Sequence, residues 1–123
     1  MPEKKKILFI CTYNISRSRA AEDLFRNSTE YEAKSAGFVY HKLGKQLVTQ
    51  ELVDWADFII TMNESDQNHD KPPCRHLSKL KESFKVKDEK VFVLGIPDNY
   101  NPNNPDLISL LKIRLKERVG IKV

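Results

Sequence analysis

The sequence predicts an α/β fold, a small open sheet of four parallel strands with helices on both faces. Apolar runs at residues 7–10, 58–62 and 91–96 are nearly continuous, which is typical of parallel strands buried on both faces. Helical patterns separate these runs, and such alternation favours a parallel sheet with right-handed crossovers. At 123 residues, the chain is long enough for one core, and we expect residues 1–123 to form a single domain.

The expected strands span residues 6–11, 32–35, 58–62 and 91–96, and the second has the weakest signal. The spacing of apolar residues predicts helices over residues 18–26, 49–56, 74–84 and 105–118, with a short polar turn at 64–69. The last helix has clear boundaries: Asn104 suits an N-cap, Pro105 the first helical position and Gly120 the residue just past the end.

Composition narrows the class of protein. Apolar residues make up 40% of the chain and charged residues 31%, as in soluble globular proteins. The apolar run at residues 7–10 is too short for a membrane span or a signal peptide. Two cysteines do not make a disulfide framework, so we expect a reducing, cytoplasmic location.

The charge pattern indicates the partners. A net charge of +4 suits acidic or phosphorylated molecules, but the charges between residues 79 and 90 are interspersed, as on a solvated helix face. The sequence contains no DNA- or RNA-binding signature. We expect no cofactor, metal or membrane partner, and the sequence leaves the oligomeric state open.

Residues 11–18 carry the main functional signal, a C-x5-R-S loop between the first expected strand and the first expected helix. Peptide N–H groups and the helix dipole make such a junction an anion site. The same surroundings, with Arg17 beside it, favour the thiolate form of Cys11. Arg17 also offers a planar fork for phosphate oxygens. The loop therefore predicts both phosphate binding and attack by a thiolate. The expected phosphate-binding residues are Thr12, Tyr13, Asn14, Ile15, Ser16 and Ser18.

Asp98 follows the last expected strand and supplies a candidate general acid. Ligands of open α/β sheets bind at the carboxyl ends of the strands, where both Cys11 and Asp98 are expected. A carboxylic acid there could protonate the leaving oxygen of a phosphate ester. Asp106 is a competitor, although it also suits the first turn of a helix. Tyr100 could flank the site and stack on an aromatic substrate, as could Tyr13.

Together these stretches resemble the low-molecular-weight protein tyrosine phosphatase family. Residues 11–18 resemble its C-x-x-N-x-x-R-S loop, 35–37 its S-A-G segment, 57–65 its third strand and following turn, and 98–100 its D-P-Y acid loop. The resemblance implies a phosphotyrosine phosphatase I-like fold and a phosphocysteine mechanism. It implies Cys11 as nucleophile, Arg17 as phosphate clamp, Asp98 as general acid and Ser18 as hydroxyl donor to the thiolate. It further implies that Asn14 holds the loop in a left-handed turn, hydrogen-bonded to Ser35.

The chain departs from that family in several places. Ser16 replaces the cysteine that many members carry before the loop arginine, and Asn99 replaces the proline of the acid loop. The segment between Gly37 and Gln46 is short, so we expect one helix fewer and leave tyrosine specificity open. An arsenate reductase-like enzyme, which needs further cysteines, would have only Cys74. A phosphocarrier domain and a non-catalytic phosphate-binding module are two further readings of the same loop.

Overall fold

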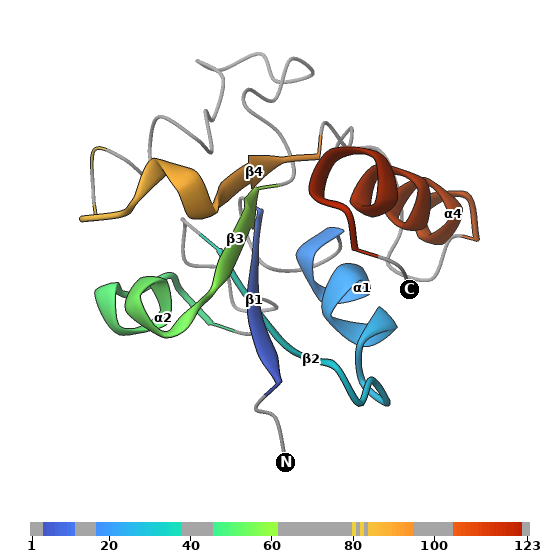
Figure 1. The fold of residues 1–123 in the computed structure, drawn as a ribbon, viewed down its shortest axis with the longest axis horizontal. Helices are drawn as coiled ribbons and strands as arrows, with labels where there is room; N and C mark the ends of the chain where they lie inside the picture. Colours follow the sequence, from blue (N-terminus) through green and yellow to red (C-terminus); the bar gives the residue numbers. More distant parts are fainter. Residues whose placement is uncertain are drawn as a thin grey trace.

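Four parallel strands form one sheet in the order β2-β1-β3-β4 (Figure 1). The fold is that of a computed structural model, which describes residues 4–11, 17–37, 46–61, 80, 82, 84–94 and 105–121, the side chains of Cys11, Arg17 and Asp88 excepted. The predicted four-stranded parallel sheet is confirmed. The strands are β1 (Lys5–Cys11), β2 (Tyr31–Gly37), β3 (Phe58–Thr61) and β4 (Val91–Val93).

Helices cover both faces of this sheet, as predicted. Helices α1 (Arg17–Leu24) and α4 (Pro105–Arg114) lie on one side, and α2 (Gln50–Trp55) lies on the other (Figure 1). Alternate residues of a strand point to opposite faces. Ile7 and Phe9 accordingly join the core under α1 and α4, whereas Leu8 and Ile10 join the core under α2. All four are fully buried, which explains why β1 has a continuous apolar run.

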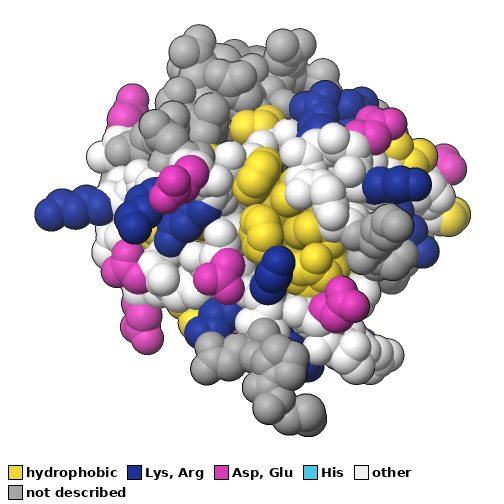
Figure 2. Space-filling view, in the orientation of Figure 1, with side chains coloured by type: hydrophobic (Ala, Val, Ile, Leu, Met, Phe, Trp, Pro, Cys, Tyr) yellow, Lys and Arg dark blue, Asp and Glu magenta, His cyan; other side chains and the backbone are white. Residues whose placement is uncertain are grey.

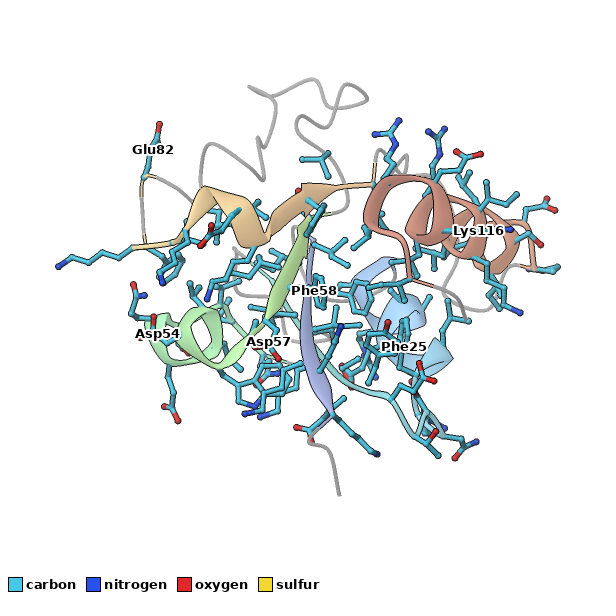
Figure 3. All side chains as sticks on the ribbon, in the orientation of Figure 1. Phe25, Asp54, Asp57, Phe58, Glu82 and Lys116 are labelled. Carbon is cyan, nitrogen blue, oxygen red and sulfur yellow. The ribbon has the colours of Figure 1, made fainter. Side chains whose placement is uncertain are left out.

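An aromatic cluster anchors α1 to the sheet. The ring of Phe25 stacks on Phe9 with 5.8 Å between centroids and meets Tyr31 edge-on at 5.6 Å. Phe25 is buried, and Figure 3 shows it on the side of the sheet where α1 lies. Because Phe9 and Tyr31 belong to β1 and β2, this cluster fixes α1 against the strand that leads into the predicted phosphate loop and against its neighbour.

Helix α2 is capped at both ends. Thr49 is its N-cap, and its hydroxyl oxygen accepts from the N–H of Leu52 at 3.2 Å. At the other end, the ammonium group of Lys90 donates to the carbonyls of Val53 and Ala56, at 2.9 and 3.1 Å. A cation is favourable at helix C-terminal carbonyls. Lys90 ends the short 3-10 helix η1 (Asp88–Lys90), so this contact ties α2 to the start of β4.

The amino ends of β1 and β3 are joined by a reciprocal pair of hydrogen bonds. The N–H of Lys6 donates to the Asp57 carboxylate at 2.9 Å, and the N–H of Asp57 donates to the Lys6 carbonyl at 2.8 Å. Figure 3 shows Asp57 at the start of β3. With the amino ends fixed on one edge, all four carboxyl ends lie on the opposite edge, where the site is expected.

The chain leaves α4 through a widened turn. The π-helix η2 (Leu115–Val119) follows directly and ends at Gly120, whose φ of 81° is left-handed. The N–H of Ile121 then donates to the carbonyl of Leu115 at 3.1 Å. Gly120 thus occupies the position after the helix that the sequence predicted. The start of α4 at Pro105 is also confirmed.

Several predicted boundaries were wrong. Strand β2 is longer than predicted because every residue from Tyr31 to Gly37 pairs with β1. Strand β4 ends at Val93, which pairs with Thr61 of β3. The α-helical part of α1 ends at Leu24, and that of α4 gives way to η2 after Arg114.

Part of the prediction lies outside the described residues. The polar turn expected at 64–69 falls there, as does most of the helix expected at 74–84. Within that helix, Leu80 and Glu82 are helical, but Phe84 is not. The N–H of Phe84 bonds the Leu80 carbonyl at 3.0 Å, and buried Leu80 contributes to the core under α2.

Figure 2 shows hydrophobic side chains gathered near the middle of one face, with charged side chains around them.

In the part of the chain that the structure describes, no helix is long and apolar enough to cross a membrane. Among the same residues, no group of three or more His, Cys, Asp or Glu side chains could hold a metal ion.

Candidate active site

The predicted phosphate loop lies between two described positions. Cys11 is the last residue of β1, and Arg17 is the first residue of α1. The loop therefore connects the carboxyl end of an inner strand to the amino end of a helix. Residues 12–16, which include Thr12, Tyr13, Asn14, Ile15 and Ser16, lie outside the described residues. Their roles, and those of the Cys11 and Arg17 side chains, stay predictions.

Ser18 is in the first turn of α1 and is fully buried. Its neighbour Arg19 is exposed, so the helix turns Ser18 toward the protein interior. Burial of a hydroxyl at this position is compatible with the predicted role beside the thiolate. That role depends on the Cys11 side chain and stays a prediction.

The carboxyl end of β2 lies beside the loop. Gly37 pairs with Cys11, and both are the last residues of their strands. On its other side, Gly37 is held by the returning chain: its N–H donates to the Gln46 carbonyl and its carbonyl accepts from the Val48 N–H, both at 2.9 Å. Residues 46–48 therefore lie beside Gly37, the last residue of β2. Because Gly37 also pairs with Cys11, this stretch lies close to the end of β1.

Ser35 connects three parts of the chain near this edge. Its hydroxyl donates to the Glu22 carboxylate on α1, and its carbonyl accepts from the Gln46 side-chain amide at 2.8 Å. Ser35 is fully buried. The resemblance implied a bond between Ser35 and Asn14, which lies outside the described residues. Because the Ser35 hydroxyl hydrogen points to Glu22, any bond to Asn14 would have to be donated by the Asn14 amide.

Strands β3 and β4 end at the same edge. Thr61 is buried, its hydroxyl donates to the Phe92 carbonyl at 3.4 Å, and its carbonyl accepts from the Leu94 N–H at 3.0 Å. The Arg118 guanidinium donates to the Val93 carbonyl at 3.3 Å. These bonds hold the carboxyl ends of β3 and β4 together and join β4 to η2.

The predicted acid loop, residues 98–100, follows β4 in the sequence. Asp98 and Tyr100 lie outside the described residues, so their roles stay predictions. Asp106, the competitor for the general-acid role, is exposed in the first turn of α4. This is the position that suits a structural helix acid.

Sequence reasoning missed Glu22. It lies four residues after Ser18, and residues at i, i+3, i+4 and i+7 share one helix face. This face holds Ser18, Ala21 and Glu22 on α1 and Phe25 just after it, and all but Glu22 are fully or almost fully buried. A carboxylate on an otherwise buried face needs a partner, and that pattern could have indicated the contact with Ser35.

Comparison with known families supports the interpretation of the C-x5-R-S loop near the N-terminus. Residues 6–51 match the family model described as low molecular weight phosphotyrosine protein phosphatase. The predicted resemblance to this family is confirmed. The match covers β1, the loop, α1, β2 and the start of α2. No curated protein matches the chain significantly.

Solved structures of low-molecular-weight phosphatases share the fold. The low-molecular-weight protein tyrosine phosphatase from T. tengcongensis has a TM-score of 0.66 at 20% identity, over 93% of this chain and 99% of that one. A low-molecular-weight protein tyrosine phosphatase from Bacillus subtilis gives 0.61 at 24% identity, over 91% and 97%. The YwlE arginine phosphatase from Geobacillus stearothermophilus gives 0.56 at 21% identity, over 92% and 91%. At these identities, the likeness establishes the fold.

Proposed function

We propose that this chain hydrolyses phosphate monoesters through a cysteinyl-phosphate intermediate on Cys11. One observation carries the proposal: β1 ends at Cys11 and α1 begins at Arg17, at the carboxyl edge of a parallel sheet. Free N–H groups and the dipole at the start of a helix attract a phosphate dianion. The family match over residues 6–51 includes this junction.

In the first step, the Cys11 thiolate attacks phosphorus, and the bond between phosphorus and the ester oxygen breaks. Asp98 donates a proton to the departing oxygen, which leaves as an alcohol or a phenol. Arg17 pairs with two of the non-bridging oxygens and stabilises the charge that they carry in the transition state. The products of this step are the free alcohol and a phosphocysteine.

In the second step, water attacks the phosphocysteine. The Asp98 carboxylate accepts a proton from that water, and the sulfur–phosphorus bond breaks to regenerate the thiolate. Inorganic phosphate is released. The thiolate is a good leaving group when helix and arginine lower its basicity, so the arrangement that favours attack also favours this step.

The substrate class follows from the site chemistry and from the neighbours. A phosphorylated protein or a small phosphate monoester would suit the loop. Of the three structures compared above, two carry the name protein tyrosine phosphatase and one the name arginine phosphatase. Because these names divide between an ester and a phosphoramidate, both kinds of substrate belong in the test.

The proposal includes the organisation and location of the protein. Residues 1–123 would act as one domain, because the two core clusters lie on opposite faces of a single sheet. A thiolate nucleophile stays active only in a reducing compartment, which supports a cytoplasmic location.

The experiment is phosphate release from a panel: p-nitrophenyl phosphate, a phosphotyrosine peptide, a phosphoserine peptide and a phosphoarginine peptide. We expect hydrolysis of at least the first two, in the presence of a chelator. The control is Cys74→Ser, which should retain activity because the mechanism uses one thiol. Absence of release from every substrate would contradict the proposal.

The same experiment separates the rival functions. An arsenate reductase would consume thiol reductant only with arsenate and would lose that activity in Cys74→Ser. A phosphocarrier would become phosphorylated without releasing phosphate. A phosphate-binding module would bind vanadate without turnover.

A further inference from the structure

Strand β2 lies at an edge of the sheet and, among the described strands, pairs with β1 alone (Figure 1). In a parallel ladder, the N–H and C=O of one residue point to the same side, and successive residues alternate between the two sides. The N–H and C=O of Gly37 bond to Gln46 and Val48, away from β1. The odd-numbered residues of β2 therefore point their backbone groups out of the sheet.

Four of these outward groups are open. The N–H of Tyr31 donates to the Ser28 hydroxyl at 3.1 Å, and the C=O of Ser35 accepts from the Gln46 side-chain amide at 2.8 Å. Between these contacts, the C=O of Tyr31, both groups of Ala33 and the N–H of Ser35 have no hydrogen-bond partner among the described residues. Such a stretch of an edge strand is a template for pairing with another strand.

We propose that β2 pairs antiparallel with β2 of a second copy of this chain, about a two-fold axis at Ala33. In this register, the N–H of each Ala33 donates to the C=O of the other, and the N–H of each Ser35 donates to the C=O of the partner's Tyr31. Every open group of both strands is then paired. The pairing leaves out only the Tyr31 N–H and the Ser35 C=O, which Ser28 and Gln46 already satisfy. It is self-complementary, as the contact of a closed two-fold dimer must be.

The charges on β2 suit this register. Glu32 of each copy lies directly opposite Lys34 of the other, in the closely spaced positions between hydrogen-bonded pairs. The ammonium group of Lys34 lies 4.5 Å from the ring centroid of Trp55, so both charges are on the face of the sheet that α2 covers. Sliding one strand by two residues would set Glu32 against Glu32 or Lys34 against Lys34, which is unfavourable. Charges on an edge strand oppose indiscriminate pairing, and here their order selects one register.

The other face of this edge is hollow. A cavity of about 440 Å³ lies between α1 and β2, and its lining includes Arg19, Asp23, Arg26, Tyr31 and Ala33. Helix α1 therefore leaves the edge at Ala33 accessible to a second strand. Because the α1 side chains in this lining are charged, that side of the interface is polar, and we expect a weak dimer that dissociates on dilution.

The first experiment is sedimentation velocity over about a hundredfold range of protein concentration, with circular dichroism to confirm that each variant is folded. Ala33→Pro removes the N–H at the axis and leaves the bonds to β1 intact, because that N–H faces outward. Glu32→Lys and Lys34→Glu each turn both opposite-charge pairs of the dimer into like-charge pairs, and the double variant restores them with the charges exchanged. The control is Glu82→Lys, the same reversal at an exposed residue outside β2, which Figure 3 shows pointing away from the sheet.

We expect the parent and Glu82→Lys to dimerise with the same dissociation constant, and Ala33→Pro to stay monomeric where the parent is dimeric. Each single reversal on β2 should raise the dissociation constant about tenfold, since two pairs per dimer change sign. The double variant should return to within about threefold of the parent, because the two positions act as a pair.

Four results would overturn the interface. They are a parent that is monomeric throughout, a folded Ala33→Pro that dimerises like the parent, single reversals with no more effect than Glu82→Lys, and a double variant as weak as the single ones. In the first case, the open edge of β2 would be left to a strand of a different protein or to solvent.

A second experiment reads the register directly. Glu32→Cys and Lys34→Cys are made separately in a Cys11→Ser, Cys74→Ser background, one of them with a mass tag. Opposed positions have Cα atoms about 4.5 Å apart, within reach of a disulfide, whereas two copies of position 32 would be about 8 Å apart and too distant. Mild oxidation should therefore cross-link the mixture and leave each variant alone largely monomeric. Disulfides that form as fast within one variant as in the mixture would contradict the register. Neither experiment measures catalysis, so a failure of the proposed function would leave both tests intact.

Discussion

Cys11 and Gly37 are paired at the last positions of β1 and β2, and Gly37 is also the residue where the chain returns through Gln46 and Val48. β1 therefore leads into the predicted phosphate loop beside Gly37, and Gly37 is itself held by two backbone hydrogen bonds, to Gln46 and Val48. On its other side, β1 pairs with β3 up to Ile10 and Thr61. The start of the loop is therefore held from both sides, which suits a nucleophile that must be placed accurately.

The packing of α1 predicts a large stability effect at Phe25. Phe25→Ala should lower the free energy of unfolding by about 3–5 kcal/mol, because it removes a buried ring and leaves a cavity against Phe9 and Tyr31. Urea unfolding followed by circular dichroism measures the change. Ile113→Ala is the control: Ile113 is 51% exposed on α4, so its truncation should cost about 0.5 kcal/mol or less. Equal losses in the two variants would contradict the packing described for α1.

Arg17 should not tolerate replacement by lysine. Arg17→Lys keeps the charge but loses the bidentate fork, so kcat/KM for p-nitrophenyl phosphate should fall about 10²-fold or more, nearly as far as in Arg17→Ala. Arg26→Lys is the control. The side chain of Arg26 is 72% exposed, and its described ion pair, with Asp23, lies at the surface. If Arg17→Lys retains more than about a tenth of the activity, Arg17 is not a phosphate clamp.

Asp98 should behave as a general acid. In Asp98→Asn, kcat should fall about 10²–10³-fold for an ester with a poor leaving group, such as an alkyl phosphate. The loss should be much smaller for p-nitrophenyl phosphate, because its phenolate needs little protonation. Asp106→Asn is the matched control in the first turn of α4 and should leave both rates unchanged.

The outcome for these two aspartates decides how the acid is assigned. Equal losses on both substrates in Asp98→Asn would make that residue structural. A leaving-group effect in Asp106→Asn would move the role to Asp106. If both variants hydrolyse both substrates at the rate of the parent, the protonation step of the proposed mechanism is wrong.

Much of the fold follows from local sequence patterns. The apolar run at residues 7–10 predicts a buried inner strand because both of its faces are covered, and Ile7 and Leu8 indeed pack into different clusters. The start of α4 at Pro105 is encoded by one residue with a fixed φ. Such features depend on neighbours in sequence, so the sequence alone can predict them.

Features that depend on contacts between distant parts of the chain were harder to predict from the sequence. Tyr31 and Gly37 extend β2 beyond its predicted ends only because β1 lies beside it. The widening at Leu115–Val119 keeps an apolar spacing close to that of an α-helix, so periodicity does not reveal it. The partner of Glu22 lies 13 residues away on another element, and only the fold brings Ser35 to it.

The same distinction applies to the candidate site. The residue types and spacing from Cys11 to Ser18 predict an anion loop, and the structure describes the strand and the helix that flank it. The side-chain geometry of Cys11, Arg17 and Asp98 depends on how segments distant in sequence meet. Their roles therefore rest on experiment.

The most direct test of the central claim is the rate of phosphate release from p-nitrophenyl phosphate by Cys11→Ser, measured beside its affinity for vanadate. A serine hydroxyl keeps the shape of the site but does not ionise near neutral pH. Turnover should therefore disappear while vanadate binding remains, and Cys74→Ser should retain both. A Cys11→Ser protein that still releases phosphate at the rate of the parent would contradict covalent catalysis by Cys11.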